Sequence, residues 1–262
     1  MSTSLTAPRL GAVLPGPRSW LRARPWLQGL LVAPGGLPHD LPHGVGGIYV
    51  LLYHGVEASH VAGLRSHLEA LVDRGRFLSW DDVVTAVQEP ESIPAGPLFC
   101  LSFDDGHKEW VDRVLPLLQE HNLPATFFLA TDRVVTGTSR TSLTWRDCAE
   151  LVGAGMAIGS HTVTHRRLTG LSDAEASYEL TGSKEIIEQR LGLQVRDFSY
   201  PFGLPGLDYT ARHREMASAA GYRSAASALP GRMERGHSVF DLRRCGLSPA
   251  WPVLAMRKRV HE

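Results

Sequence analysis

The stretch Leu-Phe-Cys-Leu-Ser-Phe-Asp-Asp-Gly at residues 98–106 is the part of the sequence from which the fold can best be read. Its first six residues are mostly apolar and follow Pro97, which is typical of a buried strand. The strand ends in two adjacent carboxylates, Asp104 and Asp105. Like charges this close resist joint ionisation unless a cation or hydrogen bonds compensate them. A solvated turn is the simpler interpretation, because Asp and Gly are common turn residues.

Strands and helices alternate along the chain from residue 47 onward. The patterns predict strands at residues 47–55, 77–79, 98–103, 125–130, 156–160, 195–200, 222–227 and 242–247. They predict helices at residues 61–74, 80–87, 109–121, 144–152, 172–191 and 211–220. Pro116 indicates a kink or a late start in its helix, and Ser172 with Glu175 indicates a capping box. This order predicts an α/β fold of parallel strands with helical crossovers, either a barrel or an open doubly wound sheet.

Composition and length narrow the class of protein further. The chain of 262 residues is long enough for one large domain, and we expect a domain at 47–262 behind a Pro-, Gly- and Arg-rich extension at 1–46. The 27 basic residues match 27 acidic ones, so no broad nucleic-acid surface is expected. Three scattered cysteines argue against a disulfide framework or a thiolate zinc site. No run approaches the roughly 20 apolar residues of a membrane span, and without a recognisable signal peptide we expect a cytoplasmic protein.

Two histidines four residues apart, His161 and His165, follow another predicted strand. On a helical turn this spacing would place both imidazoles on one face, close enough to share a metal. Two surface histidines are the simpler alternative. With Asp105, the pair forms a two-histidine, one-carboxylate set that suits zinc with an open position, and also iron, cobalt or nickel. Asp104 would then lie beside the metal, either to accept a proton from an activated water or only to orient a histidine ligand.

A third motif, Arg-Asp-Phe-Ser-Tyr-Pro-Phe-Gly at residues 196–203, ends the next predicted strand. A strand that breaks at Tyr-Pro-Phe-Gly presents backbone N–H groups in a fixed turn, and such a group can stabilise a developing oxyanion. Taken alone, the motif fits a simple strand-ending turn equally well.

Together, in this order, the three motifs resemble those of the polysaccharide deacetylases, the NodB-homology or carbohydrate esterase family 4 proteins. The family's Thr-Phe-Asp-Asp-Gly motif is similar to Ser-Phe-Asp-Asp-Gly at 102–106, its paired-histidine motif to residues 161–165, and its Arg-x-x-x-Tyr-Pro motif to residues 196–201. The resemblance extends over about residues 47–249 and includes Leu-Pro-Ala-Thr-Phe-Phe at 123–128.

This resemblance implies a distorted (β/α) barrel that removes N-acetyl groups from an N-acetylhexosamine in a glycan or glycan precursor. It implies a divalent metal, with zinc as the first candidate, bound by Asp105, His161 and His165. It makes Asp104 the general base, Arg196 its electrostatic partner, and the backbone N–H of Tyr200 an oxyanion donor.

The chain departs from the family pattern near its C-terminal end, where the usual late Leu-x-His motif of the catalytic acid is replaced by Leu-Ser-Pro at 247–249. Instead His54 follows the first predicted strand, which resembles the poly-N-acetylglucosamine deacetylase subgroup and makes His54 the candidate acid. An ordinary turn histidine is the alternative. His107 and Trp110 are candidates to line a sugar groove, although Trp110 would serve equally well in packing.

The predicted function is therefore metal-dependent deacetylation of an N-acetylated sugar. Two alternatives stay open: hydrolysis of a non-sugar linear or cyclic amide on the same fold, and glycan binding without catalysis.

Overall fold

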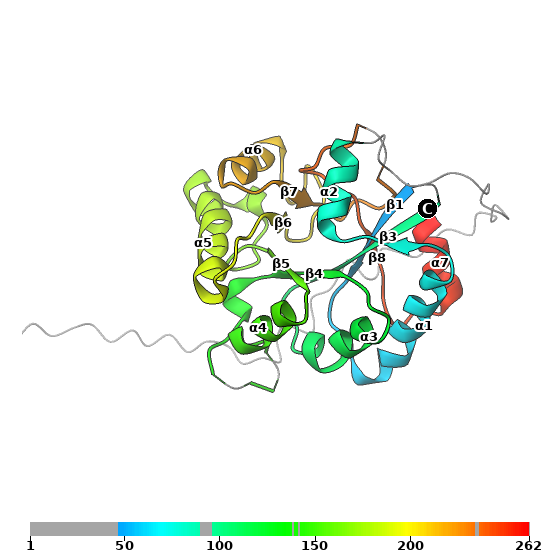
Figure 1. Cartoon of the computed structure of the whole chain (residues 1–262). Helices are drawn as coiled ribbons and strands as arrows, with labels where there is room; N and C mark the ends of the chain where they lie inside the picture. The colour runs from blue at the N-terminus through cyan, green and yellow to red at the C-terminus, as the bar shows by residue number, and fades with distance from the viewer. Residues whose placement is uncertain (1–46, 90–95, 138, 141, 234–235, 262) are drawn as a thin grey trace, which may run out of the picture. The chain divides into compact units, whose positions relative to one another are not determined.

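The computed structural model describes residues 47–262 except 90–95, 138, 141, 234–235 and 262. The extension expected at 1–46 lies outside the described residues. In the part that is described, the predicted alternation of strands and helices is confirmed (Figure 1).

One curved parallel sheet forms the centre of the domain. Its strands are β1 (Gly47–Tyr53), β2 (Arg76–Phe77), β3 (Pro97–Asp104), β4 (Ala125–Leu129), β5 (Ala157–Ser160), β6 (Asp197–Ser199), β7 (Ser224–Ala226) and β8 (Cys245–Gly246). They are ordered β7-β6-β5-β4-β3-β1-β8, with β2 beside β3 at its start. Every named pair is parallel, as helical crossovers require.

An irregular segment, residues 239–247, joins the two edges of this sheet. On one side, Leu242 forms a parallel bridge with Ala226 at the end of β7. On the other side, the Leu247 N–H donates to the Leu52 carbonyl of β1 at 2.8 Å. The strand predicted at 242–247 is thus reduced to two residues because the segment serves both edges in turn. The result is the expected distorted (β/α) barrel.

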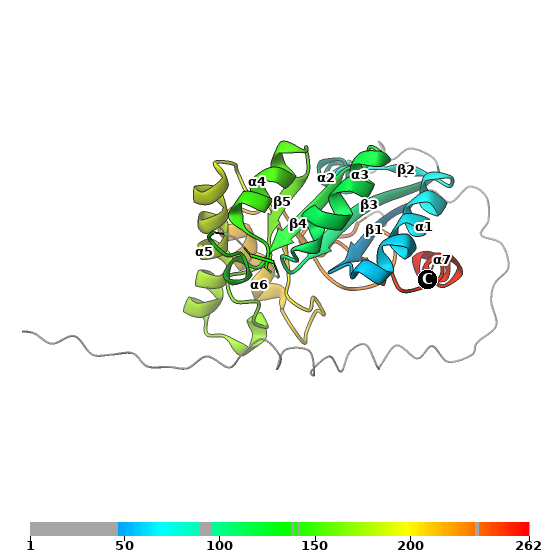
Figure 2. The same ribbon diagram turned by 90° about the horizontal axis from the view of Figure 1, so that it is seen from below.

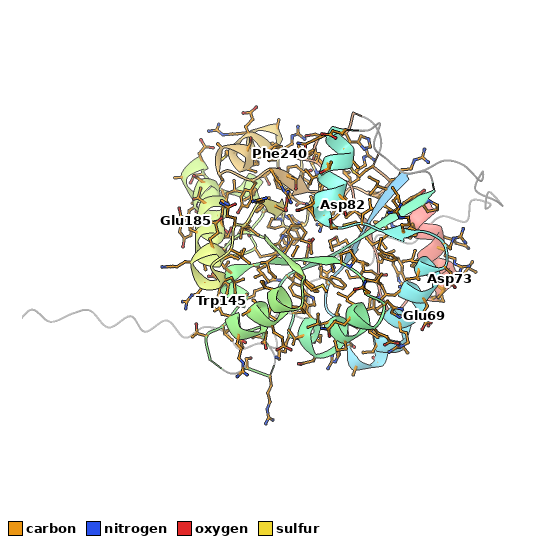
Figure 3. The ribbon with its side chains drawn as sticks, viewed as in Figure 1. Glu69, Asp73, Asp82, Trp145, Glu185 and Phe240 are labelled. Carbon is orange, nitrogen blue, oxygen red and sulfur yellow. The ribbon has the colours of Figure 1, made fainter. Side chains whose placement is uncertain are left out.

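Helices surround the strands (Figures 1 and 2). They are α1 (Val61–Val72), α2 (Trp80–Gln88), α3 (Leu115–Glu120), α4 (Trp145–Gly153), α5 (Asp173–Leu191), α6 (Ala211–Ala219) and α7 (Val253–His261). Helix α7 lies beside α1, and α6 lies beside α5. Side chains fill the space between helices and sheet, while the exposed Glu69, Asp73 and Glu185 lie on the outer rim (Figure 3).

Local sequence signals explain where these helices begin. Ser79, Thr144 and Ser172 each accept a hydrogen bond from the backbone N–H three residues on, and an acidic residue there closes a capping box. Before α3, residues Trp110–Val114 form a π-helical turn, and Pro116 lies in the first turn of α3. This agrees with the predicted late start. Helix α7 was not predicted.

Alternate residues of the strands pack into two separate apolar cores. Tyr53 and Phe103 face outward toward the helices. Ile48 and Cys100 face inward and pack with Trp80 of α2, which covers the amino ends of the strands. Mostly apolar side chains therefore cover the amino end of the barrel, where Trp80 also donates to the Ser224 hydroxyl at 3.0 Å, and the carboxylates and histidines of interest lie at the carboxyl end. Among the described residues, no helix is long and apolar enough to cross a membrane.

Candidate active site

The carboxyl ends of four strands bring the predicted residues to one edge of the barrel. Asp104 is the last residue of β3, and His161 follows the last residue of β5. The register pairs Tyr53 of β1 with Phe103 of β3, so His54 comes beside Asp104. Strand β6 ends at Ser199, whose hydroxyl donates to Asp104 Oδ2 at 2.9 Å. Carboxyl ends of parallel strands are where such folds place their chemistry.

Asp105, His161 and His165 converge on a small volume that suits a metal ion. One ligand atom from each lies within 4.8 Å of the others. The Nε2 atom of His165 is 3.0 Å from Asp105 Oδ1, and that of His161 is 3.5 Å from the same oxygen. The sequence prediction that these three residues come together agrees with this geometry.

The donor set also passes a test of fit for a metal. Asp105 Oδ1 is buried and accepts no hydrogen bond from the described residues, although two imidazole nitrogens approach it. His161 Nδ1 donates to the Ser199 carbonyl at 2.7 Å, which leaves its Nε2 lone pair directed at the shared volume. Burial alone would raise the pKa of Asp105, but His107, His161 and His165 hold it well below its usual value. The carboxylate is thus ionised, and cationic or imidazole nitrogens of Arg133, His161 and His165 gather around its Oδ1, where a metal ion would also find its ligand.

The conformation that pairs the histidines differs from the one predicted. Residues 161–165 form no helical turn, because Thr162 and His165 have φ values of 69° and 60°. Asp105 also has a positive φ, of 95°. Such backbone is strained for residues other than Gly and persists only where the surroundings hold it.

Glu179, in the middle of α5, supports this loop. Its carboxylate accepts hydrogen bonds from the Val163 N–H at 2.8 Å and the Thr164 N–H at 2.9 Å, and also binds the Thr164 hydroxyl. Only 3% of Glu179 is exposed. The sequence pattern carries no signal for this residue, because its burial becomes apparent only in the fold.

Asp104 is paired with Arg244, and the prediction of Arg196 as its partner is wrong. Arg244, 1% exposed, donates from Nη1 to Asp104 Oδ1 at 2.8 Å and from Nη2 to Oδ2 at 2.7 Å. Arg196 lies just before β6, is exposed, and donates to Gln194 instead. Burial would raise the pKa of Asp104, but the charge of Arg244, aided by His161, lowers it. Asp104 is therefore a carboxylate at neutral pH, ready to accept a proton.

The backbone N–H predicted for the oxyanion also needs correction. The Tyr200 N–H donates to the Ala226 carbonyl of β7 at 3.1 Å, so it belongs to the sheet. The Tyr200 ring is buried and stacks on Tyr209 with centroids 3.7 Å apart. Two residues on, Phe202 has a φ of 63°, and its ring centroid is 5.0 Å from that of His165. The turn thus faces the site with Phe202 rather than Tyr200.

His54 is half-buried at the end of β1, next to the two carboxylates. Burial lowers the pKa of His54 to about 4, although Asp105 and Asp104 act to raise it. The imidazole is therefore neutral at pH 7. Trp110, considered for a sugar groove, is fully buried, and its indole N–H donates to the His54 carbonyl at 3.1 Å. His107 lies with Nε2 at 3.6 Å from Asp105 Oδ2.

A barrel of this kind with such a site defines a class of hydrolase, and the sequence identifies the family. The sequence profile of the polysaccharide deacetylases matches residues 93–225, slightly more than half of the chain. The protein belongs to this family, whose members hydrolyse amides. The matched segment holds Asp104, Asp105, His161 and His165, whereas His54 and Arg244 lie outside it.

Several known proteins are similar to the chain over most of its length. YxkH of Bacillus subtilis (strain 168), which carries the family's name, is 23% identical over 205 residues, or 76% of this chain and 71% of YxkH. The Streptococcus pyogenes deacetylase PplD in complex with acetate has a TM-score of 0.73 at 22% identity, covering 82% of this chain and 99% of PplD. IcaB from Ammonifex degensii has a TM-score of 0.70 at 22% identity, covering 81% and 97%. These likenesses establish the fold.

Proposed function

We propose that the protein is a metal-dependent deacetylase that removes the N-acetyl group from an N-acetylhexosamine in a glycan or glycan precursor. The observation that carries this proposal is that two groups of residues lie close together at one edge of the barrel. One set, Asp105, His161 and His165, offers three metal ligands. The other, Asp104 with Arg244, is a buried ionised carboxylate 3.8 Å from His161 Nε2. A non-catalytic glycan-binding protein would have no use for the second set.

In this proposal the metal ligands hold a divalent ion, most simply Zn²⁺, because two imidazoles and one carboxylate leave positions open. The ion would polarise the acetamide carbonyl and make a nearby water more acidic. Asp104 accepts the proton of the attacking water, and Arg244 and Ser199 fix the orientation of its two oxygens. This arrangement keeps the base ionised at neutral pH.

His54 is the proposed acid for the departing sugar nitrogen. Since its imidazole is neutral at pH 7, it has to receive a proton during the reaction before it can donate one. Its position at the end of β1, the strand next to β3, is what supports placement in the poly-N-acetylglucosamine deacetylase subgroup. For the oxyanion we propose the Phe202 N–H in place of the Tyr200 N–H.

The test is release of acetate from N-acetylglucosamine oligomers, with mass spectrometry of the products. We expect one acetyl group to be lost per event, and D104N to reduce kcat by about 10²–10⁴-fold while zinc content stays unchanged. H54N should give a reduction within the same range, also with zinc retained. Full activity of D104N would contradict the assignment of the base. Turnover of simple amides without any sugar deacetylation would exclude the sugar substrate.

A further inference from the structure

Two arginines lie near the candidate metal ligands, Arg133 against Asp105 and Arg167 against Phe202. Arg133 ends the short turn Thr131–Arg133 after β4, and its Nη1 lies 3.0 Å from Asp105 Oδ1, the oxygen that His165 also approaches. Its side chain is 38% exposed, so the guanidinium lies between the site and solvent.

Arg167 lies against Phe202, the aromatic residue next to His165. Its guanidinium carbon lies 4.7 Å above the centre of the Phe202 ring, and that ring lies 5.0 Å from the ring of His165. Its Nε is 2.9 Å from Asp208 Oδ1, and half of its side chain is exposed. A cation held over an aromatic face in this way is kept in place while part of it remains open to solvent.

The charges around the site favour an anion at Arg133 more than at Arg167, because Arg167 is already paired with the buried Asp208. Arg244 already balances Asp104, which leaves Asp105 as the single carboxylate that both a divalent ion and Arg133 would share. Glu109, the acid near His107, lies 3.8 Å from Arg113. Asp132 is exposed, where water and salt screen its charge. Once Asp105 binds the ion, Arg133 therefore has no other carboxylate at ion-pair distance among the residues that the structure describes.

We infer that Arg133, together with Arg167 held over Phe202, forms a subsite for an anionic group, a carboxylate or a phosphate, on the N-acetylated sugar. The inference rests on the proposed deacetylation and adds to it the class of substrate: an acidic glycan rather than a neutral one. A guanidinium matches both groups because its planar N–H donors can bind two oxygens at once. In this structure the same guanidinium lies against Asp105.

The kinetic test compares three N-acetylglucosamine oligomers of equal length: one neutral, one bearing a carboxylate and one bearing a phosphate. We expect the full-length enzyme to prefer at least one charged oligomer, and R133Q to lose about 10- to 100-fold in that preference, mainly through KM. R167Q should lose less. R166Q is the matched control, because Arg166 is the neighbour of Arg167 but pairs with Glu175. Equal kcat/KM for all three oligomers would overturn the subsite, and the better charged oligomer identifies the anion.

A binding test separates failure of the subsite from failure of the deacetylase proposal. Calorimetric titration of the zinc-loaded protein with glucuronate and with glucosamine 6-phosphate needs no turnover. Binding by the wild type and R166Q, but not by R133Q, supports the subsite even if no oligomer is deacetylated. Zinc affinity should rise several-fold in R133Q, because a competing cation leaves Asp105. Unchanged zinc affinity together with unchanged sugar binding would overturn the inference.

Discussion

Arg244 and Asp104 form a buried ion pair, each side chain being almost completely shielded from water. Removing one member of such a pair leaves an unpaired charge inside the protein, at a cost of about 3–5 kcal/mol. We therefore expect R244M to lower the free energy of unfolding by roughly this amount, measured by urea denaturation. R196M, which removes an exposed arginine, should change it by less than about 0.5 kcal/mol.

The double variant D104N/R244M completes this test. With the charge of Asp104 removed as well, the penalty should fall well below that of R244M alone, since no carboxylate is left unpaired. Equal losses in the single and double variants would show that Arg244 acts through packing instead.

The contrast between Arg196 and Arg244 shows which contacts of single residues a sequence motif cannot predict. Motif spacing records the order of residues along one strand, and it correctly placed the end of β6 at the site. Arg244 is separated from Asp104 by 140 positions and reaches it from the segment that closes the barrel. That contact depends on sheet closure, which no local pattern encodes. Asp105, His161 and His165 were predictable because each directly follows a strong strand signal or lies close behind one.

At the level of elements, a glycine in α1 allows another part of the backbone to approach closely. A Cβ on Gly63 would lie 2.0 Å from the carbonyl oxygen of Pro249, which belongs to the segment that leads into α7. G63A should therefore destabilise the protein by about 1–3 kcal/mol or more through overpacking, although alanine is the better helix former by about 1 kcal/mol.

G153A supplies the matched control for that substitution. Gly153 is also helical, in α4, and a Cβ there would meet no atom within 4 Å. We expect it to stabilise the protein by about 0.4–1 kcal/mol. Urea denaturation of both variants should give shifts of opposite sign, and shifts of the same sign would contradict the packing assigned to α1.

The start of α4 predicts a pH dependence of stability. Asp147 accepts hydrogen bonds from the Thr144 N–H and from Lys108 Nζ, each at 2.8 Å. Burial would raise its pKa, but Lys108 and Thr144 lower it below the ordinary 3.8. A lowered carboxyl pKa adds stability that is fully present above the unfolded value and is lost as the pH falls through the folded one.

D147N should therefore cost about 1 kcal/mol at pH 7, and the difference from wild type should shrink below pH 3.8. Urea denaturation from pH 7 to pH 3 measures it. E150Q, on an exposed position of the same helix, should show neither effect. A difference for D147N that stays constant with pH would exclude the charge as its cause.

Elements were predicted best where their signals are local. The capping boxes at Ser79, Thr144 and Ser172 fixed three helix starts. The loop at 161–165 was predicted as a helical turn because an i,i+4 spacing is ordinary helix geometry. Its actual form depends on Glu179, which is distant in sequence, and on positive φ at residues that are not glycine. The residue types of that loop do not predict such a conformation.

For the molecule as a whole, the proposed metal joins elements that the sheet alone leaves strained. Asp105 after β3 and His165 beyond β5 both have positive φ, and each such residue costs of order 1–3 kcal/mol. A ligand that binds only the folded state offsets this cost by mass action, about 2.7 kcal/mol at one hundred times its Kd. Zinc should thus raise the Tm of the chelator-treated protein by about 5–10 °C, measured by scanning calorimetry.

Two variants decide whether this shift comes from the proposed ligands. D105N should abolish it, because the amide removes the negative charge that the divalent ion and Arg133 would share. D132N should retain the shift, because Asp132 is an exposed acid of the turn Thr131–Arg133 and is not one of the proposed ligands. A zinc shift that survives in D105N would mean that the ion binds elsewhere, and the residues at the carboxyl ends of β3 and β5 would then need another explanation for their strain.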